Sequence, residues 1–212
     1  MVKWLTTVLL AVSSSSFATQ VELTRGVEFS VLNQQDVEGK DSVSLVNGDN
    51  QLVIRLDRSF GEGDNRQKIL TPPFLVTIPA QANTQLLEIG LVSTKERKLH
   101  KLIKTNQSVF TINLDGQEIE HRLVELPGKN GFMPYGDLVG LTKKYNQENG
   151  LIYETGTLRD LKQELKTVSE GSSDISTGNE SEASLQLKIW FSRASEKEKK
   201  QHLEWVMSQL IN

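Results

Sequence analysis

Val27-Glu28-Phe29-Ser30-Val31 alternates apolar and polar side chains with a period of two. Successive side chains of a β-strand point to opposite faces of the sheet. The pattern therefore predicts a strand with Val27, Phe29 and Val31 on its apolar face and Glu28 and Ser30 in water. This stretch indicates that the fold begins with a β-sheet that buries one face.

Strand signals of this kind continue from Val21 to about Leu126. Val21-Glu22-Leu23-Thr24 alternates, and the segment 86–92 is almost continuously apolar, which is typical of a central strand or one covered on both faces. Phe74-Leu75-Val76-Thr77-Ile78 lies between Pro72-Pro73 and Pro79. Proline cannot donate to a strand ladder, so we expect these prolines to mark the ends of that strand.

Two dipeptides that accept positive φ predict hairpin turns. Asn47-Gly48 separates Val43 and Leu45 from a second apolar set, Leu52, Ile54 and Leu56. Asp115-Gly116 separates an alternating run at 109–114 from a second strand at 119–126. The segment 19–127 is therefore expected to be an antiparallel, sandwich-like β part.

The period changes after Pro127-Gly128, and residues 128–212 are predicted to be mainly helical. We expect a short helix at 135–145, a helix opened by a Thr157/Asp160 capping box, a flexible acidic loop at 171–184, and a last helix opened by a Ser195/Glu198 capping box. Apolar residues at helical spacing are expected to face a core in a helical hairpin, packed on the β part or on itself: Leu158, Leu161, Leu165 and Val168, then Leu187, Trp190, Phe191 and Ala194, and finally Leu203, Val206, Met207 and Leu210. The fold class is α+β.

The first 18 residues have the order of a cleaved secretory signal. Lys3 supplies a charge, an apolar run follows at 4–12, and Ser16-Phe17-Ala18 places small residues at an exit site. The apolar run is shorter than the roughly 20 residues of a spanning helix. We therefore expect residues 1–18 to be a signal peptide and the protein to be periplasmic.

Composition excludes several classes of function. The chain has no cysteine, which rules out thiol catalysis and zinc–thiolate sites. Removal of residues 1–18 leaves 194 residues and takes away one lysine and no acid, so the net charge changes from −3 to −4. This charge gives no reason to expect nucleic acid as a partner.

The sequence offers no catalytic, cofactor or metal constellation. The three histidines are His100, His121 and His202, and none has another three or four residues away. No Gly-x-Ser-x-Gly elbow occurs. A structural role for each histidine is favoured over a ligand or catalytic role, and no catalytic residue, cofactor or metal is assigned.

Three other segments have a functional and a structural interpretation. The stretch 61–65, Gly-Glu-Gly-Asp-Asn, is favoured as a hairpin loop over a phosphate cradle, and Asp57, Glu62 and Asp64 as solvated acids over calcium ligands. The basic cluster at 95–104 is favoured as a solvated connecting segment over a site for an anionic polymer or membrane. Trp190, Phe191 and Trp205 are favoured as packing between two helices over a sugar platform.

The chain resembles the YccT family of Gram-negative periplasmic proteins, an uncharacterised protein family. The resemblance rests on a set of segments: Leu187-Lys188-Ile189-Trp190-Phe191-Ser192-Arg193-Ala194, His202-Leu203-Glu204-Trp205, Val27 to Leu32, Asn47-Gly48 leading into Gln51-Leu52-Val53-Ile54-Arg55, and Pro72-Pro73. The resemblance implies no catalytic residues. One branch of that family is connected with curli, the extracellular amyloid fibre, as a restraint on its assembly.

Three hypotheses follow. The first is a non-enzymatic periplasmic protein that binds a polypeptide or an envelope polymer, with an unpaired sheet edge accepting an extended segment and a curli-type fibre as a possible target. The second is a module that binds a small ligand or glycan between the sheet and the helical end. The third is a hydrolase whose site is not visible in the sequence.

Overall fold

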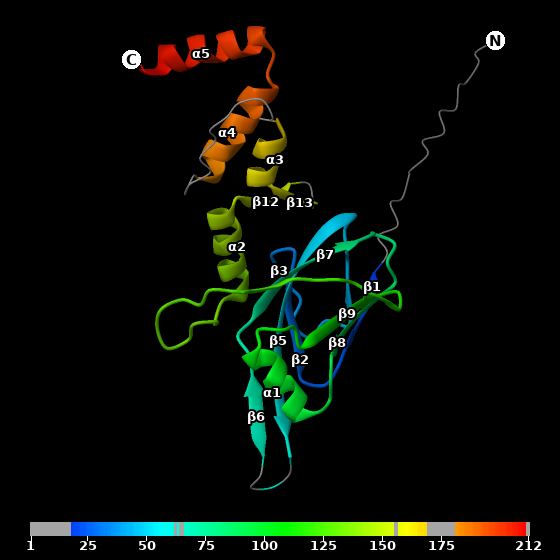
Figure 1. Ribbon diagram of the computed structural model, residues 1–212. Helices are drawn as coiled ribbons and strands as arrows, with labels where there is room; N and C mark the ends of the chain where they lie inside the picture. Colours follow the sequence, from blue (N-terminus) through cyan, green and yellow to red (C-terminus); the bar gives the residue numbers. More distant parts are fainter. Residues whose placement is uncertain (1–17, 62, 64–65, 155–156, 169–180, 211–212) are drawn as a thin grey trace, which may run out of the picture.

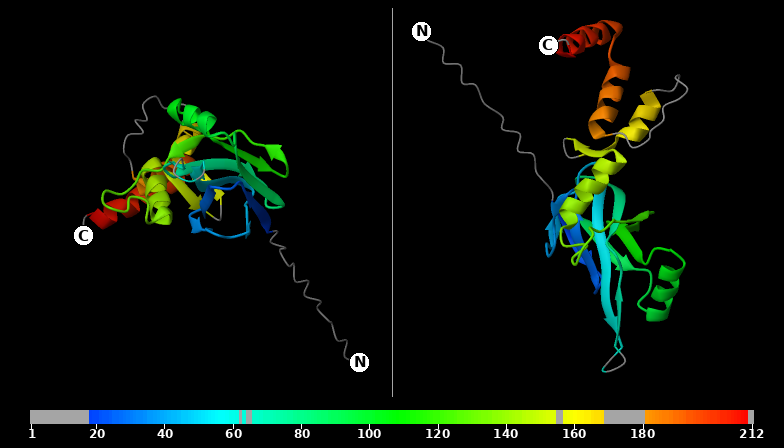
Figure 2. Two further views of the ribbon diagram at one scale, coloured as in Figure 1. Left: turned by 90° about the horizontal axis from the view of Figure 1, so that it is seen from below. Right: turned by 90° about the vertical axis from the view of Figure 1, so that its left-hand side faces the viewer.

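The computed structural model describes residues 18–61, 63, 66–154, 157–168 and 181–210 (Figure 1). Sheets form most of the N-terminal part, and the helices from residue 138 onward extend from one end of it in both side views (Figures 1 and 2), so the fold is α+β as predicted. The expected signal peptide lies outside the described residues apart from Ala18. Signal cleavage and the division at residue 127 stay predictions.

The described strands are β1 (Thr19–Leu23), β2 (Val27–Leu32), β3 (Gln35–Asp36), β4 (Ser42–Val43), β5 (Gly48–Phe60), β6 (Gln67–Leu70), β7 (Phe74–Ala80), β8 (Leu86–Leu91), β9 (Phe110–Leu114), β10 (Gln117–Glu118), β11 (Leu123–Glu125), β12 (Leu151–Glu154) and β13 (Thr157–Asp160). The helices are α1 (Glu96–Lys104), α2 (Leu138–Asn149), α3 (Leu161–Val168), α4 (Glu182–Arg193) and α5 (Glu196–Leu210).

Two sheets enclose the main core. The first has the order β10-β9-β8-β1-β4, and the second has the order β11-β7-β5-β2-β3 with β6 paired to the end of β5. The described pairs are antiparallel except for β1 with β8, which is parallel. Ile89 and Ile112 of the first sheet share one core cluster with Leu52 and Ile54 of the second. The apolar segment at 86–92 is the central strand β8, as expected.

The strand at 27–32 forms, but its alternation breaks at Ser30. The register with β5 shifts between Phe29 and Val31, which inserts one extra residue into β2. Val27 and Phe29 face the main core, whereas Val31 belongs to a second cluster on the other face of the sheet. The prediction that Ser30 lies in water and Val31 beside Phe29 is therefore wrong, because Ser30 is buried within the irregularity.

The hairpin predicted at Asn47-Gly48 does not form. β4 pairs with β1 in the first sheet, while β5 pairs with β2 and β7 in the second, so the chain crosses between sheets at this point. The buried Asn50 holds the crossing, since its carboxamide accepts from Val46 N at 2.9 Å and donates to Val46 O at 2.9 Å. Gly48 has a φ of +96°, a conformation that favours glycine. The residue is therefore needed here although the predicted hairpin turn does not form.

The Asp115-Gly116 turn forms as predicted, with φ values of +50° and +79°. Its return strand is only the two residues of β10, however, because the chain then leaves the first sheet and β11 pairs with β7 in the second. The prediction that Pro79 ends its strand is wrong, because β7 continues through Pro79 to Ala80. β11 pairs with only the first three residues of β7. No described strand is paired with Pro79 on that side, so its missing N–H costs no hydrogen bond there.

The helical part begins with α2, which overlaps the helix expected at 135–145. The Asp137 carboxylate accepts a hydrogen bond from Gly140 N at 2.8 Å and so caps the N-terminus. The backbone hydrogen bond from Gly140 and the hydrogen bond from Lys129 lower the pKa of Asp137. Leu141 packs into the second cluster against Val53 and Leu75 of the second sheet.

The capping box predicted at Thr157 and Asp160 is wrong. Thr157 to Asp160 form β13, which pairs with β12, and the helix begins only at Leu161. Asp160 itself caps that helix, because its Oδ1 accepts from Lys162 N and Gln163 N at 2.9 and 3.0 Å. Of the loop expected at 171–184, residues 171–180 lie outside the described part. Its last four residues belong to α4 and to the cap of α4, Ser181.

Candidate functional site

The α4 helix buries one apolar face and exposes another. Leu185 and Ile189 form a small core with Ile152, Leu161 and Leu165 of β12 and α3. Leu187, Trp190 and Phe191 lie on the other side and are 57%, 66% and 39% exposed. The prediction that this second set faces a core is wrong, because α3 packs against the face that carries Leu185 and Ile189.

The α5 helix begins as predicted at a Ser195/Glu198 capping box. Ser195 N donates to Glu198 Oε2 at 2.8 Å, and Ser195 Oγ donates to the same oxygen at 2.6 Å. Hydrogen bonds from the Ser195 side chain and backbone lower the pKa of Glu198. In Figure 1, α5 turns sharply away from α4 at the end of the molecule opposite the β5–β6 hairpin.

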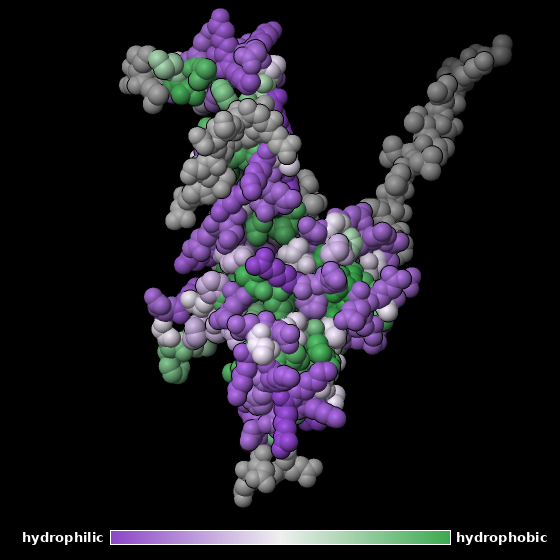
Figure 3. Space-filling model, in the orientation of Figure 1, coloured by the Kyte–Doolittle hydropathy of each residue, from purple (hydrophilic) through white to green (hydrophobic). Residues whose placement is uncertain are grey.

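A helical hairpin packed on itself was one of the two predicted arrangements, and α3 and α4 pack together in this way through Leu161, Leu165, Leu185 and Ile189. Leu203, Trp205 and Met207 of α5 are more than half exposed. Figure 3 shows hydrophobic side chains (green) on the surface of α5. Trp190, Phe191 and Trp205 were predicted to pack between two helices. This prediction is wrong, because all three side chains are exposed.

A groove of about 400 Å³ lies between α4 and α5; we call it the α4–α5 groove. Its lining residues are Leu187, Trp190, Phe191, Arg193, Ala194, Glu198, Lys199 and His202. Lys199 Nζ lies 2.9 Å from Glu196 Oε1 and 5.8 Å from the centre of the Phe191 ring. Glu198 is engaged by Ser195, and the His202 ring lies beside the Trp205 ring with centroids 5.7 Å apart. The charged groups of the groove are thus already occupied within the chain.

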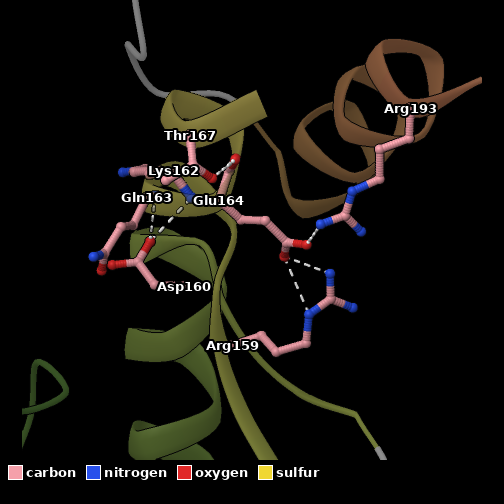
Figure 4. Close-up of polar contacts among 7 residues, drawn as sticks. All are labelled: Arg159, Asp160, Lys162, Gln163, Glu164, Thr167 and Arg193. Atoms are coloured by element: carbon pink, nitrogen blue, oxygen red, sulfur yellow. Dashed lines mark hydrogen bonds and ion pairs between the residues drawn. The ribbon is translucent and has the colours of Figure 1, made fainter. Parts of the chain in front are cut away.

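An ion-pair network holds the α4 wall of the groove. Glu164 of α3 lies between Arg159 and Arg193 and makes a hydrogen-bonded ion pair with each (Figure 4). Partial burial opposes ionisation of Glu164, but the hydrogen bond and charge of Arg159, together with Arg193, outweigh it and lower the pKa of Glu164. The network connects β13, α3 and the C-terminal end of α4.

A second, more polar groove of about 550 Å³ lies where the sheet meets the helical part. Asn33, Gln35, Ser42, Ser44 and Tyr153 are among its lining residues. The Tyr153 hydroxyl donates to Asn33 Oδ1 at 2.6 Å and accepts from Gln51 N at 3.1 Å. Burial, aided by the nearby charge of Asp49, raises the pKa of Tyr153 despite the hydrogen bond from Gln51.

The three histidines lie apart from one another. His100 is on α1 with its Nε2 3.6 Å from Glu96 Oε1, and His121 contacts Ser108 Oγ at 3.1 Å. His202 lines the α4–α5 groove. Within the described residues, no group of three or more His, Asp or Glu side chains is placed to hold a metal ion.

The remaining candidates fall into ordinary structure. The strands on the two sides of the 61–65 stretch, β5 and β6, pair antiparallel as the hairpin interpretation predicts; residues 62, 64 and 65 lie outside the described part. Asp57 forms an ion pair with Lys68 at 2.9 Å, while Glu62 and Asp64 lie outside the described residues. The basic cluster at 95–104 forms the helix α1 and its N-cap, Lys95; it connects β8 to β9, and its Lys and Arg residues are exposed.

The sheet edges are short. The strands that end the two sheets, β10, β4, β11 and β3, have two or three residues each. Short edge strands are one of the ways in which proteins limit edge-to-edge pairing. They also leave part of the neighbouring strand unpaired, since β11 pairs with only Phe74 to Val76 of β7; strand addition at an edge therefore stays a prediction.

The profile of a bacterial protein family, described as an uncharacterized protein conserved in bacteria (DUF2057), matches residues 20–205. The chain belongs to the DUF2057 family. The match includes both sheets, the α4–α5 groove and most of α5. No solved structure matches the chain, and no helix within the described ranges is long and apolar enough to span a membrane.

Several bacterial proteins that carry the name UPF0319 are similar to this DUF2057 chain. Protein VV2327 of Vibrio vulnificus (strain YJ016) is 28% identical over 159 residues, which cover 75% of each chain. A Vibrio cholerae relative is 24% identical over 189 residues, 81% of this chain and 78% of its own. Protein NTHI1987 of Haemophilus influenzae (strain 86-028NP) is 23% identical over 212 residues and 94% of each chain. These three names state no activity or ligand.

Proposed function

We propose that the protein is an exported, periplasmic, non-enzymatic protein that binds another polypeptide in the α4–α5 groove. One observation supports this function above the others: Leu187, Trp190 and Phe191 are exposed beside a groove whose charged groups already have partners. Contiguous exposed apolar side chains are typical of interaction surfaces. Tryptophan, phenylalanine and methionine are enriched in the buried centres of protein interfaces.

The chemistry of the groove favours a partner that supplies apolar side chains. Lys199 and Glu198 are engaged by Glu196 and Ser195, so a charged partner would have to compete with bonds within the chain. An anionic surface is less favoured here, because residues 182–210 contain five Lys or Arg and four Glu. This near balance of charge gives little electrostatic attraction to such a surface.

The resemblance to the YccT family supports one class of partner, the subunit of a curli-type extracellular amyloid fibre. Amyloid segments are short, apolar and low in net charge, and they are exposed before they assemble. Such a segment would bury its apolar side chains against Trp190 and Phe191. Occupation of the groove would then withhold the segment from a growing fibre.

Fibre growth of a curli-type subunit, followed by dye fluorescence, tests this function. The protein lacking residues 1–18 is expected to lengthen the lag phase at substoichiometric ratio, and the double variant Trp190→Ala, Phe191→Ala to lose most of this effect. The matched control is Phe132→Ala, Met133→Ala, which removes two apolar side chains that are exposed outside the groove. Unchanged lag times with the parent protein, or equal loss in both variants, would contradict the proposal.

A second function, binding of a glycan or small ligand, is favoured by the polar groove beside Tyr153. Its amide and hydroxyl groups from Asn33, Gln35 and Ser42 resemble the sparse polar contacts that orient small ligands. A thermal-shift screen with periplasmic glycans and nucleotides tests it, since a ligand that binds only the folded state raises the melting temperature. A shift that persists in the Trp190→Ala, Phe191→Ala variant would assign the ligand to the polar groove.

A further inference from the structure

The α1 helix concentrates positive charge in a chain that is acidic as a whole. Residues 95–104 carry five Lys or Arg and one Glu, so this segment has a formal charge of +4 while the whole chain has −3. The cations are Lys95, Arg97, Lys98, Lys101 and Lys104, and each of these residues is exposed. The single acid, Glu96, lies beside His100.

None of the five cations forms an ion pair with an acidic side chain of the described residues. This sets α1 apart from the α4–α5 groove, where Lys199 and Arg193 pair with Glu196 and Glu164. Repulsion between unpaired like charges on one short helix raises the free energy of the unbound protein. Binding to an anionic partner relieves this repulsion. The charge pattern of α1 is thus complementary to a negatively charged surface.

The fold holds these cations outward on a rigid element. Leu99 is fully buried in the main core and Leu102 packs against it, so this face of α1 is fixed to the β part. Arg97, Lys101 and Lys104 follow the i, i+4, i+7 spacing and form a stripe on the opposite face. Figures 1 and 2 place α1 at the outer side of the β part, far from α4 and α5, and Figure 3 shows hydrophilic surface (purple) in that region.

We propose that α1 docks the protein on an anionic lipid surface. Lysine and arginine side chains near such a surface each contribute roughly 1 kcal/mol, about fivefold in affinity, and the attraction decays within a Debye length of about 10 Å. Because α1 lies at the outer side of the β part, several of its cations can approach a flat lipid surface to within this distance at the same time. Because α1 and the α4–α5 groove lie at opposite ends, the protein engages the lipid surface without covering the groove.

Sedimentation with lipid vesicles tests the proposal. The protein lacking residues 1–18 is expected to bind vesicles rich in phosphatidylglycerol at low salt, to dissociate at high salt, and to leave phosphatidylcholine vesicles unbound. The triple variant Arg97→Glu, Lys101→Glu, Lys104→Glu is expected to bind about a hundredfold more weakly, given roughly fivefold for each of the three cations.

The matched control is Lys143→Glu, Lys166→Glu, Lys200→Glu, which changes the net charge equally at exposed lysines of α2, α3 and α5. It is expected to retain most of the binding, and circular dichroism of both variants verifies folding. Equal loss in the two variants, or absence of vesicle binding by the parent, would overturn the proposal. Binding that depends on α1 but occurs only with a soluble polyanion such as polyphosphate would also overturn the assignment to lipid. These outcomes leave the proposal for the α4–α5 groove unaffected.

Discussion

Gln51 and Asn146 form a reciprocal pair of hydrogen bonds between β5 and α2. Gln51 Nε2 donates to Asn146 Oδ1 at 2.7 Å, and Asn146 Nδ2 donates to Gln51 Oε1 at 2.8 Å. Both residues are about 99% buried, so neither amide can turn to water if the other is removed. The pair fixes the helical end of the protein to the second sheet.

Replacement of Asn146 is expected to destabilise the protein through the partner that remains. Asn146→Ala leaves the buried Gln51 amide without its partner, and we expect a loss of about 1–3 kcal/mol in the free energy of unfolding. Urea denaturation measures this loss. The double variant Gln51→Leu, Asn146→Leu is expected to lose less than the sum of the two single variants. Strict additivity would show that the two amides act independently.

Ionisation of Glu164 is expected to stabilise the helical part except in acid. Its pKa is lower in the folded protein than the ordinary value of 4.5, so the carboxylate contributes stability above about pH 4.5 and loses it as the pH falls through the folded pKa. Glu164→Gln is expected to lower the free energy of unfolding by about 1 kcal/mol at neutral pH, the upper end of the range for an exposed ion pair, and by progressively less below pH 4.5. Denaturation curves from neutral to acidic pH measure the difference. A constant difference would contradict the assigned role.

A leucine-to-alanine substitution is expected to lower the free energy of unfolding much more on the buried face of α4 than on its exposed face. Leu185→Ala removes a fully buried side chain and should cost about 2–5 kcal/mol. Leu187→Ala removes an exposed one and should change stability by less than about 0.5 kcal/mol. Thermal or urea denaturation compares the two variants. If Leu187→Ala proved the more damaging, the face assigned to the groove would be the buried one.

The Ser195 cap is expected to control the start of α5. Ser195→Ala removes the hydroxyl that bonds to Glu198, and such a loss is typically about 1 kcal/mol, or about fivefold in local opening. Amide hydrogen exchange in the first turn of α5 should therefore accelerate about fivefold while exchange in β5 stays unchanged. Ser195→Asp, which also caps helices, should restore protection.

Local signals predicted much of the fold, and non-local contacts account for the errors. The Ser195/Glu198 cap and the Asp115-Gly116 turn are specified by residues within four positions, and both form. The partner of a strand is not local: Asn47-Gly48 resembles a hairpin turn, yet the strands on its two sides belong to different sheets. The inserted residue at Ser30 likewise reflects pairing with β5 rather than the sequence of β2.

The candidate site was predicted least well for a related reason. Leu185 with Ile189, and Leu187 with Trp190 and Phe191, are two apolar sets at helical spacing on one helix. Periodicity cannot tell which set is buried, because the answer depends on where α3 packs. The one signal in the sequence that favours a surface role is the continuation of large aromatic residues from Trp190 and Phe191 to Trp205 in the next helix.

The fluorescence of the two tryptophans tests the central claim most directly. Without residues 1–18 the chain contains only Trp190 and Trp205, both exposed on α4 and α5. Titration with a monomeric curli-type subunit that lacks tryptophan, in the presence of acrylamide, should give a saturable blue shift and reduced quenching as the groove is covered. Emission and quenching that stay unchanged across a titration in which fibre growth is nevertheless delayed would contradict binding at this groove.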